Sequence, residues 1–251
     1  MSSQNWFERK ILNSVRKRLA KRASYPAVVR HFEATFVLDP ANWIDNRLIA
    51  KIPFEVRQIE RAKALISQHG IDLFIDIGAN FGLYTILLGR MEAISKVIAI
   101  EPMRRNYNQL LANVFANRLD GKVSARQCAI SQTTGTATLY IDPQSTGLSR
   151  LDLAGSHRDA SVFRDSEEIA TAHFDETYPM TSQNVFVKID VEGHALKVVS
   201  TMGVFLDQNN AILQIELFET EKEDVSDFLG SHGYVEIDEI EGDYYFMPSL
   251  V

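Results

Sequence analysis

The stretch LFIDIGANFGLYTILLGRM, residues 73–91, decides the fold of this chain. Its first residues form a short apolar run, which is typical of a strand buried on both faces, and residues 83–91 have the apolar periodicity of a helix. Between the two, Gly78, Asn80 and Gly82 allow positive φ angles and a close approach to a ligand. We therefore predict a strand, a tight turn and a helix whose first amide groups favour an anionic ligand group.

The turn differs from the known phosphate-binding loops. Counted from Gly78, the second and third glycine positions of G-x-G-x-x-G hold Asn80 and Leu83, and no Lys follows as it does in G-x-x-x-x-G-K-[ST]. A turn with few glycines and no phosphate-binding Lys suits a nucleoside ligand with a carboxylate better than a polyphosphate. This disfavours a nicotinamide-dependent oxidoreductase, although a purely structural tight turn stays open.

Similar apolar runs alternate with helical patterns along the rest of the chain, which predicts an α/β fold with a doubly wound, mostly parallel sheet. We expect a terminal hairpin around Gly242, and in the helix at 106–118 we expect Leu110, Leu111, Val114 and Phe115 to face inward. The expected strands lie within residues 73–78, 96–102, 122–131, 136–142, 186–193 and 211–219, and the expected helices within 54–70, 83–91, 106–118, 194–202 and 221–233.

Carboxylates follow two of the predicted strands. Glu101 ends the strand after the turn, 19 residues beyond Gly82, where an acid accepts hydrogen bonds from both hydroxyls of a ribose. Asp190 and Glu192 end the strand at 186–191, at the same rim of the sheet. They could hold a cofactor amine, accept a proton or bind a cation. The plainer alternatives are that Glu101 caps a helix and that the other two acids are merely solvated.

With these residues in place, the sequence resembles the FkbM-type family of S-adenosylmethionine-dependent methyltransferases. The resemblance covers roughly residues 71–219 and rests on the segments FIDIGANFGLYT, VIAIEP, CAIS, FDET and VKIDVEGH. It implies a Rossmann-like methyltransferase fold with a seven-stranded sheet and a reversed last strand. It also implies S-adenosylmethionine as the cofactor and, most often, O-methylation of a sugar, glycan or secondary metabolite.

The resemblance also implies roles for single residues. Glu101 would hold the ribose, Thr85 the cofactor carboxylate, and Asp190 would lie near the transferred methyl group. The methionine end would be lined by Asp76, Gly78, Asn80 and Gly82, and the adenine would be bordered by Ala129, Ile130 and Ser131. One position departs from the family: two residues after the Gly of DVEG, where Glu is common, this chain has Ala195.

Methyl transfer to a hydroxyl requires a group that takes up the hydroxyl proton. The candidate bases are Asp190, Glu192 and His194, and His194 has the best unperturbed pKa for that task but could equally be structural. A divalent cation between Asp190 and Glu216 is an alternative, but too few acids converge in the sequence to predict a metal. Two other functions share the cofactor residues: an N- or C-methyltransferase, and a non-catalytic partner protein, for which Ala195 would be a sign of decay.

Length and composition set the domain organisation. The chain has 251 residues, of which 45% are hydrophobic and 24% charged, so wholesale disorder is excluded, and its single cysteine, Cys128, excludes a disulfide framework and a multi-Cys zinc site. We expect a basic amphipathic helix and a connecting segment in residues 1–53 and a methyltransferase domain in 54–251. Within it, residues 143–184 are expected to be an acceptor-side insertion, or else a disordered surface excursion.

The charge is distributed unevenly. Residues 1–30 carry eight basic side chains and one acid, about +7, whereas the remainder carries −14. The acidic remainder argues against nucleic-acid binding. The helix expected at 5–24 could pack its apolar stripe on the body, fold back on it by charge, or make a peripheral contact with an anionic membrane. No apolar run reaches the length of a membrane span or a secretory signal, so we expect a cytoplasmic protein.

Overall fold

A seven-stranded sheet forms the centre of the computed structural model, which describes residues 3–142, 149 and 163–249 and omits the side chains of residues 3–9 and 11. In spatial order its strands are β11 (Tyr234–Ile240), β12 (Asp243–Pro248), β10 (Asn210–Glu216), β9 (Asn184–Ile189), β3 (Leu73–Ile77), β4 (Lys96–Ile100) and β5 (Val123–Arg126). β12 pairs antiparallel with both of its neighbours, and all other pairs are parallel. The predicted doubly wound sheet with one reversed strand is confirmed.

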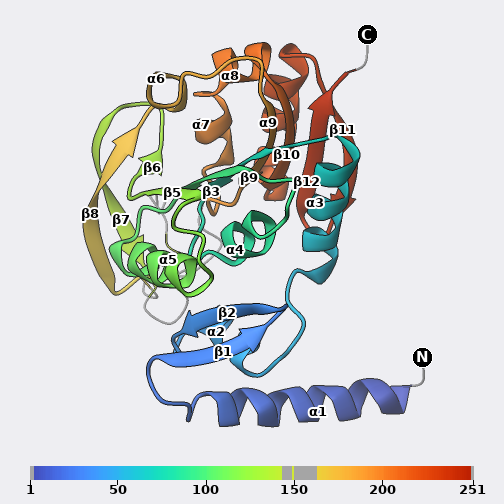
Figure 1. The fold of residues 1–251 in the computed structure, drawn as a ribbon, viewed down its shortest axis with the longest axis vertical. Coiled ribbons are helices and arrows are strands. Elements are labelled where there is room, and N and C mark those ends of the chain that lie inside the picture. The colour runs from blue at the N-terminus through green and yellow to red at the C-terminus, as the bar shows by residue number, and fades with distance from the viewer. Residues whose placement is uncertain (1–2, 143–148, 150–162, 250–251) are drawn as a thin grey trace.

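Helices cover both faces of this sheet (Figure 1). One face carries α3 (Val56–Gln68), α4 (Leu83–Gly89) and α5 (Arg104–Ala116), and the other carries α7 (Ala195–Val199), α8 (Gly203–Gln208) and α9 (Glu219–Ser231). Side chains of a strand alternate between the faces, so Phe74 of β3 packs with the first layer and Ile75 with the second. Because both faces are covered, the central strands β3, β4, β9 and β10 are largely apolar and buried.

A second, three-stranded sheet stands beside the first and corrects one strand prediction. It has the order β6–β8–β7, with β6 (Ala129–Ile130), β7 (Gly135–Ile141) and β8 (Asp165–Ala172); the short α6 (Phe174–Thr177) follows it. The single strand expected at 122–131 is wrong, because the chain leaves the edge of the large sheet after Arg126 and pairs with β8 instead. Residues 143–148 and 150–162 of the expected insertion lie outside the described residues.

The inward face of α5 is narrower than predicted. Leu110 and Val114 are buried, but Leu111 is 40% and Phe115 is 77% exposed, so their inward placement was wrong. The reason is helix geometry: Leu111 and Phe115 lie on the side of α5 that faces neither the sheet nor the N-terminal segment. The polar row on the other side of Leu110 and Val114 contacts the N-terminal segment.

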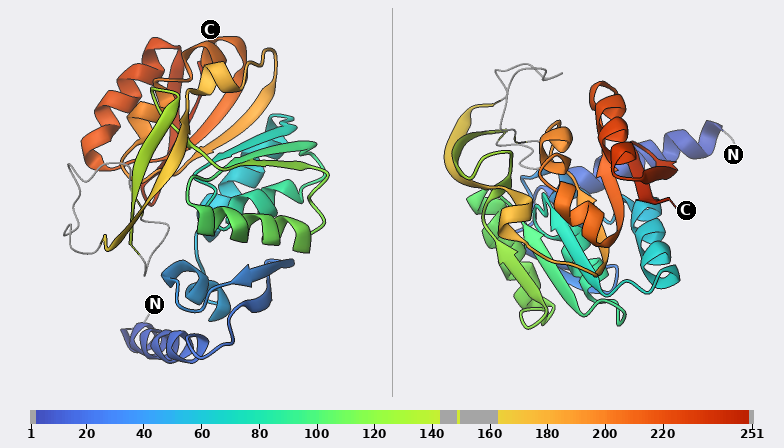
Figure 2. Two further views of the ribbon diagram at one scale, coloured as in Figure 1. Left: turned by 90° about the vertical axis from the view of Figure 1, so that its left-hand side faces the viewer. Right: turned by 90° about the horizontal axis from the view of Figure 1, so that it is seen from above.

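The N-terminal segment contains more structure than a helix and a connection. The predicted helix is present as α1 (Ser3–Ala20), but it is followed by a hairpin of β1 (Ala27–His31) and β2 (Ala34–Leu38) and by α2 (Trp43–Ile49). Figure 1 and the left view of Figure 2 place α1 away from the central sheet. Of the predicted apolar stripe, Leu12, Val15 and Leu19 are about half exposed and are therefore not buried against the body. The side chains of Phe7 and Ile11 lie outside the described part of the chain, so packing of the whole stripe stays a prediction.

The hairpin is held by three amide side chains of α5, Gln109, Asn113 and Asn117, here called the amide ladder. Asn117 accepts from the backbone N–H of Thr35 (3.0 Å) and donates to its carbonyl (2.7 Å). Asn113 accepts from the N–H of Val37 (2.6 Å), and Gln109 donates to the Val37 carbonyl (3.0 Å). A helix therefore satisfies an edge of β2 that would otherwise need another strand.

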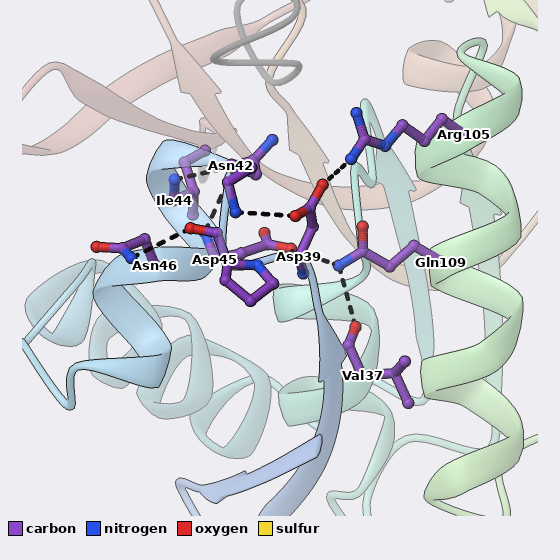
Figure 3. A network of polar contacts seen from close by, with 10 residues as sticks. Val37, Asp39, Asn42, Ile44, Asp45, Asn46, Arg105 and Gln109 are labelled. Atoms are coloured by element: carbon purple, nitrogen blue, oxygen red, sulfur yellow. Dashed lines mark hydrogen bonds and ion pairs between the residues drawn. The ribbon is translucent and has the colours of Figure 1, made fainter. Parts of the chain in front are cut away.

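A buried carboxylate extends this attachment to α2 (Figure 3). Oδ2 of Asp45 accepts from the N–H of Asp39 (2.7 Å) and from Nε2 of Gln109 (2.6 Å), and Asp39 forms an ion pair with Arg105. Asn42 caps the helix by accepting from the N–H of Ile44 (3.0 Å). Burial raises the pKa of Asp45 to about 7, although its hydrogen bonds oppose that shift.

Candidate active site

A cleft opens at the carboxyl ends of β3, β4 and β9, where ligands bind in sheets of this type. It holds about 660 Å³ of empty space, part of it open to solvent. Of the predicted site residues, the structure places eight on its wall: Gly78, Asn80, Glu101, Ala129, Ile130, Asp190, Glu192 and His194.

The turn after β3 forms one end of the cleft, and its first glycine is required by close backbone packing. Gly78 has φ +84°, and a Cβ at this position would lie 1.8 Å from the carbonyl oxygen of Asp190. The N–H groups of Gly78 and Ala79 both donate to the carbonyl of Ile100, at 2.9 and 3.0 Å. The ends of β3, β4 and β9 are thereby brought together around the cleft.

Asp76, Thr85 and Gly82 lie beneath the turn and not among the cleft-lining residues. The Thr85 hydroxyl donates to Oδ2 of Asp76 at 2.6 Å, and both side chains are buried. Burial raises the pKa of Asp76 to about 6, against the effect of that hydrogen bond. Gly82 has φ +92°, where a Cβ would lie 2.6 Å from Leu110. In this structure the three residues support the shape of the turn.

Glu101 is fixed in the middle of the cleft. It is 5% exposed, its Oε2 accepts from the N–H of Asn80 (2.8 Å), and its Oε1 accepts from the N–H of Met103 (2.9 Å). Burial raises the pKa of this carboxyl to about 7, although these bonds favour the charged form. The Asn106 side chain also donates to this carboxylate. Because a carboxylate accepts about four hydrogen bonds, capacity remains for a ligand hydroxyl.

The wall beyond Glu101 is apolar and comes largely from the small sheet. Ala129 packs with Met103 and Leu139, and all three line the cleft together with Cys128. Ser131, also predicted here, lies outside the lining and donates its N–H to the carbonyl of Ala172 (3.0 Å). Sequence reasoning missed Met103 and Leu139. The first follows Glu101 by two residues, which is a usable signal, whereas the second arrives through a sheet that was not predicted.

At the open side of the cleft, Asp190 is supported by a buried lysine. Nζ of Lys188 lies 3.0 Å from Oδ2 of Asp190 and 4.7 Å from the centre of the Tyr84 ring. Burial alone would raise the pKa of Asp190, but the Lys188 ammonium and the hydrogen bonds from Glu216 and Lys188 hold it below its usual range. Repulsion by Asp190, together with burial, raises the pKa of Glu216 far above its usual range. These shifts favour the ionised form of Asp190 and the protonated form of Glu216.

Carboxylate oxygens of Asp190, Glu192 and Glu216 lie within 4.8 Å of one another, close enough to share a cation. The positive charge that the structure supplies to Asp190 is the ammonium of Lys188. Lys188 lies in the segment VKIDVEGH, but the sequence alone assigned it no role. Its signal is its spacing of two residues from Asp190, which places both side chains on one face of the strand.

The charge of the cleft discriminates between cofactors. Its described lining includes the carboxyl groups of Glu101, Asp190 and Glu192 but no Lys or Arg. Such a lining suits a ligand with positive charge, hydroxyl groups and an aromatic base, and it does not suit a polyphosphate. A sulfonium nucleoside such as S-adenosylmethionine fits this set of donors and acceptors.

The comparison with known families agrees with this chemistry. Residues 76–236 match the methyltransferase FkbM domain. The chain belongs to the FkbM methyltransferase family. This family uses S-adenosylmethionine, the cofactor that the lining of the cleft fits.

Curated relatives of this FkbM-family chain are distant. It is 35% identical over 77 residues to Methyltransferase sdnD of Sordaria araneosa, covering 31% of this chain and 30% of that protein. It is 23% identical over 142 residues to Methyltransferase 1 of Beauveria bassiana, covering 50% and 56%. It is 30% identical over 100 residues to the 31-O-demethyl-FK506 methyltransferase FkbM of Streptomyces tacrolimicus, covering 38% and 36%. The matches thus span between about a third and just over half of each relative.

Solved structures share the fold of this FkbM-family chain. The delta-N METTL16 methyltransferase domain superposes with a TM-score of 0.50 at 11% identity, covering 95% of this chain and 94% of that chain. TYW2 of M. jannaschii, solved in complex with AdoMet, gives 0.48 at 15% identity, covering 90% and 84%. Identities this low concern the fold alone. Among the described residues, no helix is both long and apolar enough to cross a membrane.

Proposed function

We propose that this chain is an O-methyltransferase that transfers the methyl group of S-adenosylmethionine to a hydroxyl of a sugar, glycan or secondary metabolite. The observation that carries the proposal is the acidic cleft without a cationic side chain among its described lining residues, with Glu101 fixed in its centre. The relative from Streptomyces tacrolimicus is named for an O-demethyl substrate, which supports a hydroxyl acceptor.

Glu101 and the apolar wall would hold the nucleoside part of the cofactor. With both of its oxygens already oriented by backbone N–H groups, Glu101 would accept hydrogen bonds from the two ribose hydroxyls. Met103, Ala129 and Leu139 would cover the adenine. The turn at 78–82 would then border the methionine end, and Asp190 would face the cationic centre.

S-adenosylmethionine supplies an electrophilic methyl group on a positively charged sulfur. The protein must hold the acceptor oxygen in line with that group and exclude competing water. As the new C–O bond forms and the C–S bond breaks, the acceptor hydroxyl loses its proton. Asp190, Glu192 and His194 lie together at the open side of the cleft, where one of them would take up this proton.

Asp190 is best suited to orient the acceptor hydroxyl. It is ionised, its carboxylate is held by Lys188 at 3.0 Å, and Glu216 shares a proton with it, so its direction is fixed. Its low pKa makes it a weak base but a strong hydrogen-bond acceptor. We assign final proton uptake to His194 or Glu192, which line the same cleft.

The test is calorimetric titration with S-adenosylhomocysteine and with NAD, followed by transfer of labelled methyl groups to a panel of hydroxyl, amine and carbon acceptors. Binding of S-adenosylhomocysteine with O-methylation of at least one acceptor supports the proposal. Transfer only to amines or carbon would reassign the acceptor class. Cofactor binding without transfer to any member of a broad panel would favour the non-catalytic partner protein, for which Ala195 is the sequence feature.

A further inference from the structure

One side of the N-terminal helix α1 contacts α2 and the turn after it, and its other described sides are exposed to solvent. The attached side is short: the carbonyl of Lys17 accepts from Nδ2 of Asn46 at 3.2 Å, and Ala20 is buried against Ala50 and Ile52. These contacts join the C-terminal half of α1 to α2 and its following turn. Figure 1 and the left view of Figure 2 show α1 lying apart from the seven-stranded and three-stranded sheets.

An apolar row runs along an open side of this helix. Leu12, Val15 and Leu19 are 49%, 50% and 58% exposed, and their spacing of three and four residues places them on one face. On a helix of about 100° per residue, this row lies well away from Lys17 and Ala20, which face α2 and its following turn. The row is therefore covered by no other described part of the protein.

Basic side chains flank the apolar row on both sides. Arg16 lies next to Leu12 and Leu19 around the helix, and Arg18 lies on the other side, next to Val15. Both are exposed, and neither forms an ion pair with a described carboxylate. No acidic residue occurs between Glu8 and Glu33, whereas the chain beyond residue 30 is strongly acidic.

We infer that α1 binds the surface of a bilayer that contains anionic lipids, with Leu12, Val15 and Leu19 in the acyl boundary and Arg16 and Arg18 at the phosphates. A narrow aliphatic row between two lines of cations matches the boundary between headgroups and acyl chains. A nucleic acid would match the cations but would leave the aliphatic row in water.

The experiment is flotation of the whole protein with vesicles of phosphatidylcholine, alone or with about a third phosphatidylserine. Wild-type protein should bind the anionic vesicles at least tenfold more than the neutral ones, and raising the salt to about 0.5 M should release it. The triple variant Leu12→Ser, Val15→Ser, Leu19→Ser should lose this binding, and so should Arg16→Gln, Arg18→Gln. The control, Val204→Ser with Val235→Ser, removes side chains of 55% and 45% exposure elsewhere and should float like the wild type.

The inference would be overturned by wild-type protein that stays below the anionic vesicles at low salt, by a triple Ser variant that floats as well as the wild type, or by binding to RNA in place of vesicles. Light scattering provides the further check. If the triple Ser variant turns an oligomer into a monomer, the row is a contact between copies of the chain and the inference is wrong. Equal melting temperatures of all variants would show that lost flotation is not lost folding.

Discussion

Glu101 is the residue on which cofactor binding depends most. Replacing it with Ala removes the acceptor of two ribose hydrogen bonds, each worth ~1.5–3 kcal/mol when one partner is charged. We expect the affinity for S-adenosylhomocysteine to fall by well over tenfold, as measured by calorimetry. Glu239→Ala, an exposed carboxylate on β11, is the control and should leave the affinity unchanged. Equal affinities of Glu101→Ala and wild type would show that Glu101 does not hold the ribose.

The same carboxyl should make cofactor binding depend on pH. Its pKa in the free protein is raised to about 7 by burial, and only its ionised form can accept from both hydroxyls. The affinity for S-adenosylhomocysteine should therefore weaken as the pH falls from about 8 to 6, approaching tenfold per unit below the pKa. Titrations across this range measure the slope, which should flatten in Glu101→Gln. An identical slope in that variant would assign the pH dependence to another group.

Asp190 should affect turnover far more than cofactor affinity. In Asp190→Asn the amide oxygen can still accept from Lys188, so the buried ammonium keeps a partner, but the charge that orients the acceptor is lost. We expect turnover to fall by ~10²–10⁴-fold, with a melting temperature close to that of the wild type. Full activity of Asp190→Asn would remove Asp190 from the mechanism.

The carboxylates and the glycine turn on the cleft wall could be predicted from the sequence because they follow strand ends. Glu101, Asp190 and the turn at 78–82 share one edge once a parallel sheet is assumed. Lys188 could not be assigned, because a lysine within an apolar strand has no visible partner until the strand register is known. For Thr85 the position could be predicted but the role could not. It lies in the first turn of α4 as expected, but its hydroxyl donates to Asp76.

At the scale of elements, the amide ladder is the feature most open to test. Asn113 accepts from the N–H of Val37 and donates to the carbonyl of Phe81 at 2.8 Å, so it joins the hairpin to the cofactor-binding turn. Asn113→Ala leaves both backbone groups buried without this partner, and we expect a loss of ~2–4 kcal/mol in the free energy of unfolding by urea denaturation. The control is Asn108→Ala, on an exposed side of the same helix, which should change stability by less than ~0.5 kcal/mol. A loss no larger than that of the control would show that the ladder adds nothing to stability.

Elements with clear periodicity were predicted well, and the hairpin and small sheet were not. β3, β4, β9 and β10 are short apolar runs bounded by turns, and this pattern indicates a buried strand. β1 and β2 are short and half-buried, and their sequences do not alternate regularly between polar and apolar residues. The partner on one edge of this hairpin is a helix, so no third strand could be recognised there. β6 has two residues and depends on β8, more than thirty residues away in sequence.

For the whole molecule, buried carboxyl groups should make stability rise as the pH falls. Asp45, Asp76 and Glu101 have pKa values raised to about 7, 6 and 7 by burial. Because these values lie above those of the unfolded chain, the folded state binds more protons between about pH 7 and 4.5, and stability is gained through that window. His31, whose pKa is lowered by burial and by Lys51, opposes this with one group.

We therefore expect the cofactor-free protein to melt several degrees higher at about pH 5.5 than at pH 8, as measured by scanning calorimetry. Cofactor affinity should fall over the same decrease in pH. These opposite trends distinguish acid stabilisation of the cofactor-free protein from acid stabilisation of the complex. A melting temperature that falls steadily from pH 8 to 5.5 would contradict the raised pKa values.

The length of the amide ladder is limited, because the helix and the strand advance by different distances from one rung to the next. Four residues of α5 advance by ~6.0 Å, whereas two residues of a strand such as β2 advance by ~6.7 Å, so each rung falls behind by ~0.7 Å. Asparagine side chains serve the first two rungs, at Thr35 and Val37. The third rung has glutamine, one methylene longer, and Gln109 still reaches back to Val37 rather than on to the next residue pair. A helix can therefore imitate a neighbouring strand for about three rungs, which sets an upper bound on any hairpin attached in this way.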